Sequence, residues 1–174
     1  MNQYQLIAHF NEWVNRRLYN SVAQLSDEAY RRNRNAFFGS IHNTLNHLLV
    51  VDRLWTGRIA GVDRGIRSLD QILCDDLETL RAARVVEDQQ IIDLVDGLDV
   101  QRLGMRVTYT RMIGSGKQET RVDHILATLF NHQTHHRGQI HCMLTQEGIT
   151  PEPWDVIFFL EDTDKMYGSR RADG

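Results

Sequence analysis

The first 150 residues of this 174-residue chain contain no proline, since its two prolines are Pro151 and Pro153. Proline breaks or kinks a helix when it stands in the helix interior, so this stretch can carry long uninterrupted helices. Apolar residues recur along it at spacings of three and four, which is the period of a helix face packed against a core. The sequence therefore predicts an all-α protein.

Four long amphipathic helices are expected, over residues 4–25, 40–59, 68–95 and 120–148. Ser40 is the expected N-cap of the second helix, and Gly61 is the expected glycine at its C-terminal end. A capping box formed by Ser68 and Gln71 is expected to open the third helix. Helices of this length and pattern predict a four-helix bundle.

The connection between the third and fourth expected helices is long enough to let the chain cross the bundle. Its segment 106–110 is rich in β-forming residues and is followed by glycines at 114 and 116, which predicts a short hairpin there. Residues 1–162 are expected to form one domain, with residues 163–174 as a polar C-terminal tail.

The composition is that of an ordinary globular protein, with 41% hydrophobic and 25% charged residues and a formal net charge of -3. The absence of a basic excess argues against a nucleic-acid partner, and the apolar runs are too short to span a membrane. No secretory signal is recognisable, so a cytoplasmic location is expected. Cys74 and Cys142 are accordingly expected to be reduced thiols.

Five of the eight histidines lie on the expected helix 120–148, and two of them interrupt its apolar stripe. His132 and His136 continue the spacing of the stripe, which consists of Val122, Ile125, Leu129, Ile140 and Met143. Burying two imidazoles costs free energy unless each finds a partner. Their i, i+4 spacing places both rings within reach of one metal ion. The pair is therefore interpreted as metal-binding, with two hydrogen-bonded core histidines as the alternative.

His47 is the candidate third ligand, because it lies on the inward face of the expected helix 40–59, beside Leu48. Three neutral imidazoles leave one position for water or substrate, as in catalytic zinc sites. Gln133 stands where an H-E-x-x-H zincin has its glutamate, and no glutamate has a histidine three residues later, as a di-iron bundle requires. A site rich in nitrogen and poor in carboxylates suits zinc, nickel or copper best.

The remaining polar residues of interest carry weaker predictions. Arg53 and Arg137 are candidates for orienting an anionic substrate, with surface or structural roles as the alternative. A second stripe on the last helix is interpreted as a polar rim or subunit contact, and three other histidines are expected at the surface. The stripe consists of His124, Thr128, Asn131, His135 and Cys142, and the three histidines are His9, His42 and His141.

Three local patterns coincide with those of a known family: Phe-Asn-Glu-Trp at 10–13, the segment 39–48 followed by Leu-Trp at 54–55, and the segment 131–139. On these patterns the chain resembles the DinB/YfiT-like family of metal-dependent bundles. The His-x-x-x-His-Arg-Gly-Gln string at 132–139 is the most specific part. The resemblance implies a four-helix bundle with a crossed connection, often a homodimer, and a metal held by His47, His132 and His136. His135 maps to no ligand.

The resemblance also implies a class of chemistry. Better-understood relatives use a low-molecular-weight thiol such as bacillithiol or mycothiol, and a metal favours the thiolate form of a coordinated thiol. The expectation is a zinc- or nickel-dependent thiol S-transferase, or a related hydrolase or isomerase, acting on a small electrophile, with no catalytic base identified. Two alternatives stay open: a non-catalytic, damage- or stress-related dimeric metal-binding bundle, and a bundle whose histidines only form hydrogen bonds.

Overall fold

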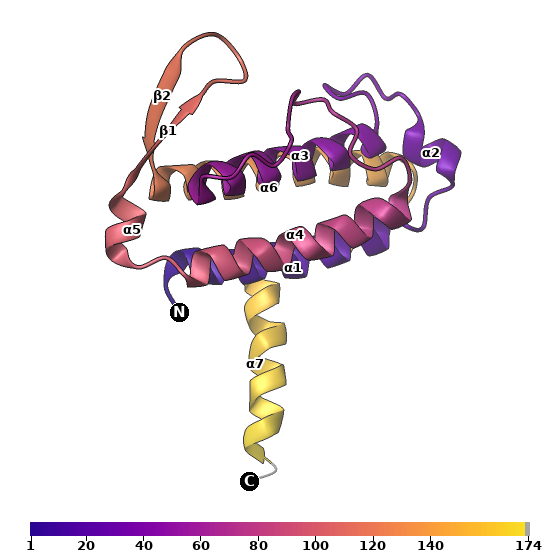
Figure 1. Cartoon of the computed structure of the whole chain (residues 1–174). Coiled ribbons are helices and arrows are strands. Elements are labelled where there is room, and N and C mark those ends of the chain that lie inside the picture. Colours follow the sequence, from indigo (N-terminus) through magenta and orange to yellow (C-terminus); the bar gives the residue numbers. More distant parts are fainter. Residues whose placement is uncertain (173–174) are drawn as a thin grey trace.

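The computed structural model describes the backbone of residues 1–172 and the side chains of residues 1–164. Four long helices form the body of the molecule: α1 (Gln3–Val22), α3 (Ile41–Ala60), α4 (Leu77–Asp96) and α6 (Val122–Gln146). They lie in two layers, with α3 beside α6 and α1 beside α4 (Figure 1). The predicted all-α four-helix bundle is thus confirmed, with a small two-stranded sheet added to it.

The long helices are not arranged simply up and down. Arg58, near the end of α3, donates a 2.8 Å hydrogen bond to the carbonyl of Thr110 in the hairpin that follows α4. The C-terminal ends of α3 and α4 therefore lie at the same end of the bundle, and the two helices run parallel (Figure 1). The connection that crosses the bundle is residues 61–76, between α3 and α4. The long connection predicted between the third and fourth long helices is present, but it does not cross the bundle, because it joins α4 and α6 at one end (Figure 1).

The third long helix also begins later than expected. Ser68 and Gln71 form no capping box, since the Ser68 hydroxyl bonds to Asp70 and the Gln71 side chain accepts from the backbone of residue 67. The N-cap is Asp76 instead, whose carboxylate accepts the backbone N–H of Thr79 at 2.8 Å.

A buried amide explains why residues 68–76 do not become helical. Asn46 on α3 has no exposed surface, and its Oδ1 accepts the backbone N–H groups of Leu73 and Cys74 at 2.8 and 3.0 Å. Its Nδ2 donates to the carbonyl of Cys74 at 3.1 Å. These bonds satisfy the backbone of the crossover within the bundle, so it gains less from becoming helical.

The ends of α3 agree with the sequence prediction. The hydroxyl of Ser40 accepts the backbone N–H of Asn43 at 3.1 Å, and Gly61 closes the helix with φ of 71°. Only glycine adopts that left-handed conformation at little cost. The segment before α3 contains a short helix, α2 (Asp27–Arg31).

The predicted hairpin is present between the last two long helices. After the short helix α5 (Val100–Gly104), β1 (Arg106–Thr110) pairs antiparallel with β2 (Lys117–Arg121). The ring of Tyr109 on β1 meets the ring of Trp55 on α3 edge-on, with centroids 5.2 Å apart. This contact holds the hairpin against α3.

The final helix, α7 (Val156–Ala172), projects away from the α1–α4 layer (Figure 1). Phe159 anchors its start, with ring centroids 6.1 Å from Phe10 and 5.8 Å from Trp13. The backbone remains helical through Ala172, within the segment 163–174 that was expected as a tail. No helix in the described part of the chain has the length and apolar content needed to cross a membrane.

A network of buried polar side chains crosses the bundle interior. Arg84 of α4 contacts Asp52 Oδ2 at 2.5 Å and Asp88 Oδ1 at 3.0 Å, and all three side chains are almost fully buried. Burial raises the pKa of Asp52 to about 7 and that of Asp88 to about 6. Arg137 joins the same region through Asn11, so it is an interior residue rather than a surface one.

Candidate metal centre

His47 of α3 and His132 and His136 of α6 converge at one point between the two helices. One nitrogen from each ring lies within 4.8 Å of the others, and the Nε2 atoms of His47 and His132 are 3.0 Å apart. Two imidazole nitrogens bound to one tetrahedral zinc ion at about 2.1 Å lie roughly 3.4 Å apart. The structure therefore brings together all three residues predicted as ligands, at a spacing that fits a single ion.

Two of the imidazoles are oriented by partners on their outer nitrogen. His47 Nδ1 is 2.7 Å from the carbonyl of Leu69, and His136 Nδ1 is 2.7 Å from Oε1 of Gln139. Both partners are acceptors, so each Nδ1 carries the proton and each Nε2 keeps its lone pair. The Nδ1 of His132 is buried, and no described residue bonds to it. His47 and His136 therefore have the orientation that metal centres use, in which the outer nitrogen donates to an acceptor, and His132 departs from it.

The electrostatics of the cluster keep all three rings neutral at pH 7. Burial lowers the pKa of His132 to about 3 and that of His136 to about 4, and it also lowers the pKa of His47. The proximity of the other rings depresses the values of His132 and His136 further. Metal ions bind the neutral imidazole, so no proton has to be displaced before binding.

The three imidazoles line a cavity of about 580 Å³. The ring of Phe38 stacks on His47 with centroids 3.8 Å apart, and Met112 and Ile113 at the hairpin tip also line the cavity. Other apolar and aromatic walls come from Phe37, Val51, Leu54, Trp55, Leu69 and Tyr109. None of the described lining residues is an aspartate or glutamate. A ligand in this cavity would contact the histidines directly, amid mainly apolar walls.

Two arginines that were not predicted from the sequence, Arg58 and Arg111, also line the cavity. The Arg58 guanidinium lies 4.5 Å from the ring centre of Trp55 and 4.1 Å from that of Tyr109, and burial lowers its pKa. Arg58 stands eleven positions after His47, which places both on one helix face, so helical periodicity was the available signal.

The two arginines predicted as substrate-orienting residues do not line the histidine cavity. Arg53 Nε lies 3.3 Å from the carboxylate of Glu87, and Arg137 is only 5% exposed within the polar interior. At the histidine cavity, both arginines therefore have a structural role, which was the alternative interpretation, and do not orient a substrate there.

Of the other histidines, His135 lies beside the centre: it lines the same cavity, and its ring centroid is 4.8 Å from that of His136. The second stripe of α6, including His124 and His135, is exposed, as a polar rim would be. His42 was expected at the surface but is buried, with its Nδ1 3.0 Å from the hydroxyl of Tyr30. His9 and His141 are half-buried. Cys74 and Cys142 are free thiols, as predicted.

Comparison with known proteins agrees with this architecture. The profile of the DinB family matches residues 1–170. Protein DinB of Bacillus subtilis (strain 168) is 26% identical over 166 residues, covering 90% of this chain and 94% of that protein. The crystal structure of a DinB-like protein from Bacillus cereus ATCC 10987 has the same fold, with a TM-score of 0.61 at 17% identity, over 80% of this chain and 89% of the other. The chain belongs to the DinB family.

Proposed function

We propose that this DinB-family chain is a metal-dependent enzyme that joins a low-molecular-weight thiol to a small electrophile. One observation carries the proposal: three neutral imidazoles converge on the wall of a cavity of about 580 Å³. Structural zinc sites are closed by four protein ligands, whereas catalytic ones keep a position for water or substrate. An all-nitrogen donor set favours zinc or nickel.

His47, His132 and His136 would hold the ion, and its chemistry would be to depress the pKa of a thiol bound beside them. The carbonyl of Leu69 and the amide of Gln139 keep His47 and His136 in the ligand tautomer. The thiol proton passes to solvent, since no described carboxylate lines the cavity. The sulfur electron pair forms the new bond to the electrophilic carbon, and the leaving group departs with its bonding pair.

The rest of the cavity suits an anionic partner with an apolar body. Arg58 and Arg111 supply positive charge, and the aromatic side chains of Phe38, Trp55 and Tyr109 offer packing surface to an apolar body.

The test uses the wild type, His136→Ala and a matched control, His124→Ala, which changes an exposed histidine of the same helix. Elemental analysis measures bound metal, and turnover of monobromobimane or chlorodinitrobenzene is measured with a panel of small thiols. We expect about one zinc or nickel ion per chain in the wild type and the control, with thiol-dependent turnover. His136→Ala should lose both.

Two outcomes would contradict the proposal. If the protein binds metal but turns over no substrate with any thiol of the panel, it is a non-catalytic metal-binding bundle. A folded protein that takes up no metal on reconstitution would leave histidines that only form hydrogen bonds.

A further inference from the structure

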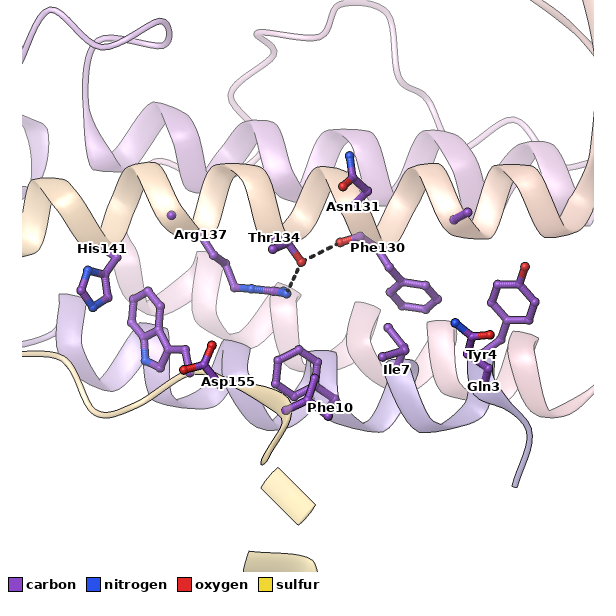
Figure 2. A pocket seen from close by; sticks show the side chains of 14 residues that line it. Gln3, Tyr4, Ile7, Phe10, Phe130, Asn131, Thr134, Arg137, His141 and Asp155 are labelled. Atoms are coloured by element: carbon purple, nitrogen blue, oxygen red, sulfur yellow. Dashed lines mark hydrogen bonds between the residues drawn. The ribbon is translucent and has the colours of Figure 1, made fainter. Parts of the chain in front are cut away.

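A second cavity, of about 590 Å³, lies between α1 and α6 (Figure 2). None of its lining residues also lines the histidine cavity, so the two are separate sites. Phe10 of α1 and Phe130 of α6 face each other across it, and the segment before α7 contributes Trp154. Further apolar contacts come from Tyr4, Ile7, Ala127 and Val156. Its volume lies in the range of small-molecule sites.

Arg137 brings a buried positive charge to this apolar cavity. Its side chain is only 5% exposed, and its guanidinium lies among the lining residues (Figure 2). Nη1 donates to Asn11 Oδ1 at 2.5 Å and to Gln133 Oε1 at 3.4 Å, and Nη2 donates to Thr134 Oγ1 at 3.2 Å. All three acceptors are neutral.

The guanidinium has donors left over. Arginine carries five N–H groups, so three bonds leave two without an acceptor among the described residues. The nearby carboxylates of Asp52 and Asp88 bind Arg84 directly and contact Arg137 through no described bond. A buried cation without a direct anionic partner is costly, and a carboxylate is the group whose geometry matches the guanidinium fork.

We propose that the cavity between α1 and α6 binds a small apolar or aromatic carboxylate, with Arg137 holding the carboxylate. Phe10 and Phe130 enclose the apolar body of the ligand, and Thr134 helps to orient the guanidinium. Asp155, the acidic residue among the described lining side chains, is exposed, so water screens its charge. The proposal is independent of the chemistry at the histidine centre.

The probes are 3-phenylpropanoate and 3-phenylpropanamide, which share size and shape but differ in charge. Binding is measured by isothermal titration calorimetry on the metal-free full chain, so that coordination at the histidines contributes nothing. We expect one site per chain and at least tenfold tighter binding of the acid than of the amide. Equal affinities would overturn the role of Arg137.

Gly138→Leu locates the site without touching Arg137. Gly138 lines the cavity, and a Cβ atom added there would meet nothing within 4 Å, so a leucine can fill the space in a folded protein. We expect at least a tenfold loss of binding in Gly138→Leu. The matched control is Gly104→Leu on α5, where a Cβ atom likewise meets nothing, and it should bind as the wild type does.

Two further outcomes would overturn the proposal. Undiminished binding in Gly138→Leu would place the ligand elsewhere. Absence of binding to the folded wild type at millimolar probe would remove the site, for instance because a second copy of the chain covers this face.

Discussion

Glu87 on α4 binds side chains of α3 and of the crossing connection, residues 61–76, and so holds this connection against the bundle. Its carboxylate is 1% exposed and accepts two bonds from Arg64, at 2.8 and 2.9 Å, one from Arg53 at 3.3 Å and one from Thr56 at 3.1 Å. Arg64 belongs to the connection 61–76, which also carries the Leu69 carbonyl to His47. The substitution Glu87→Gln preserves size but leaves two arginines without their carboxylate.

The expected loss follows from how buried the partners are. Removing one member of a buried ion pair costs about 3–5 kcal/mol. The side chains of Arg53 and Arg64 retain 26% and 23% exposure, so water can solvate the released cations. We therefore expect a loss of about 2–3 kcal/mol in the free energy of unfolding. With a urea dependence of about 2 kcal/mol/M, the unfolding midpoint falls by about 1–1.5 M.

Urea unfolding of metal-free protein, followed by far-UV circular dichroism, measures this loss. The matched control is Glu78→Gln, which changes an exposed glutamate on the same helix and should shift the free energy by less than about 0.5 kcal/mol. If Glu87→Gln costs no more than Glu78→Gln, the carboxylate does not fasten the crossover and the reasoning fails.

Three further outcomes are expected. Gln139→Leu removes the acceptor for His136 Nδ1 and should weaken zinc binding about tenfold in a chelator competition; unchanged affinity would contradict its orienting role. In metal-free protein the folded-state pKa of His132, about 3, lies below its ordinary value, so the unfolded chain takes up the proton first as the pH falls. The contribution of His132 to stability is then complete above about pH 6.5, and the free energy of unfolding falls by about 1–2 kcal/mol between pH 6 and pH 4. His132→Leu should reduce this loss, measured by urea unfolding at each pH. The same dependence of the free energy of unfolding on pH in the wild type and the variant would contradict the prediction. Asn46→Ala leaves the buried N–H groups of Leu73 and Cys74 without an acceptor and should cost about 3 kcal/mol by urea unfolding, whereas Asn43→Ala, whose side-chain amide bonds to one exposed carbonyl, should cost under about 1 kcal/mol.

The histidine centre could be predicted because its signal is local. His132 and His136 interrupt an apolar stripe one turn apart, and His47 lies on the inward face of its own helix. Helical periodicity alone reveals such positions, whatever the helices pack against. The caps at Ser40 and Gly61 are local in the same sense.

The features that were missed depend on contacts between distant segments. The capping box at Ser68 is overridden because Asn46, on another helix, bonds to the crossover backbone. Arg58 lines the histidine cavity together with Tyr109, which lies about fifty residues later in the sequence and is brought next to Arg58 by the hairpin. Arg137 is buried because partners such as Asn11 lie on a different helix. Sequence spacing within one segment carries no information about these neighbours.

The order in which the chain is made has a consequence for metal loading. His47 and His132, whose Nε2 atoms are 3.0 Å apart, are separated by 85 positions in the sequence. Closing so long a loop costs entropy, and only the packing of α6 against the bundle offsets that cost. Before α6 has been made, the chain therefore presents a single imidazole, which binds a metal ion weakly. We expect the ion to enter after the helices have docked, so that bound zinc slows unfolding and leaves the rate of folding nearly unchanged.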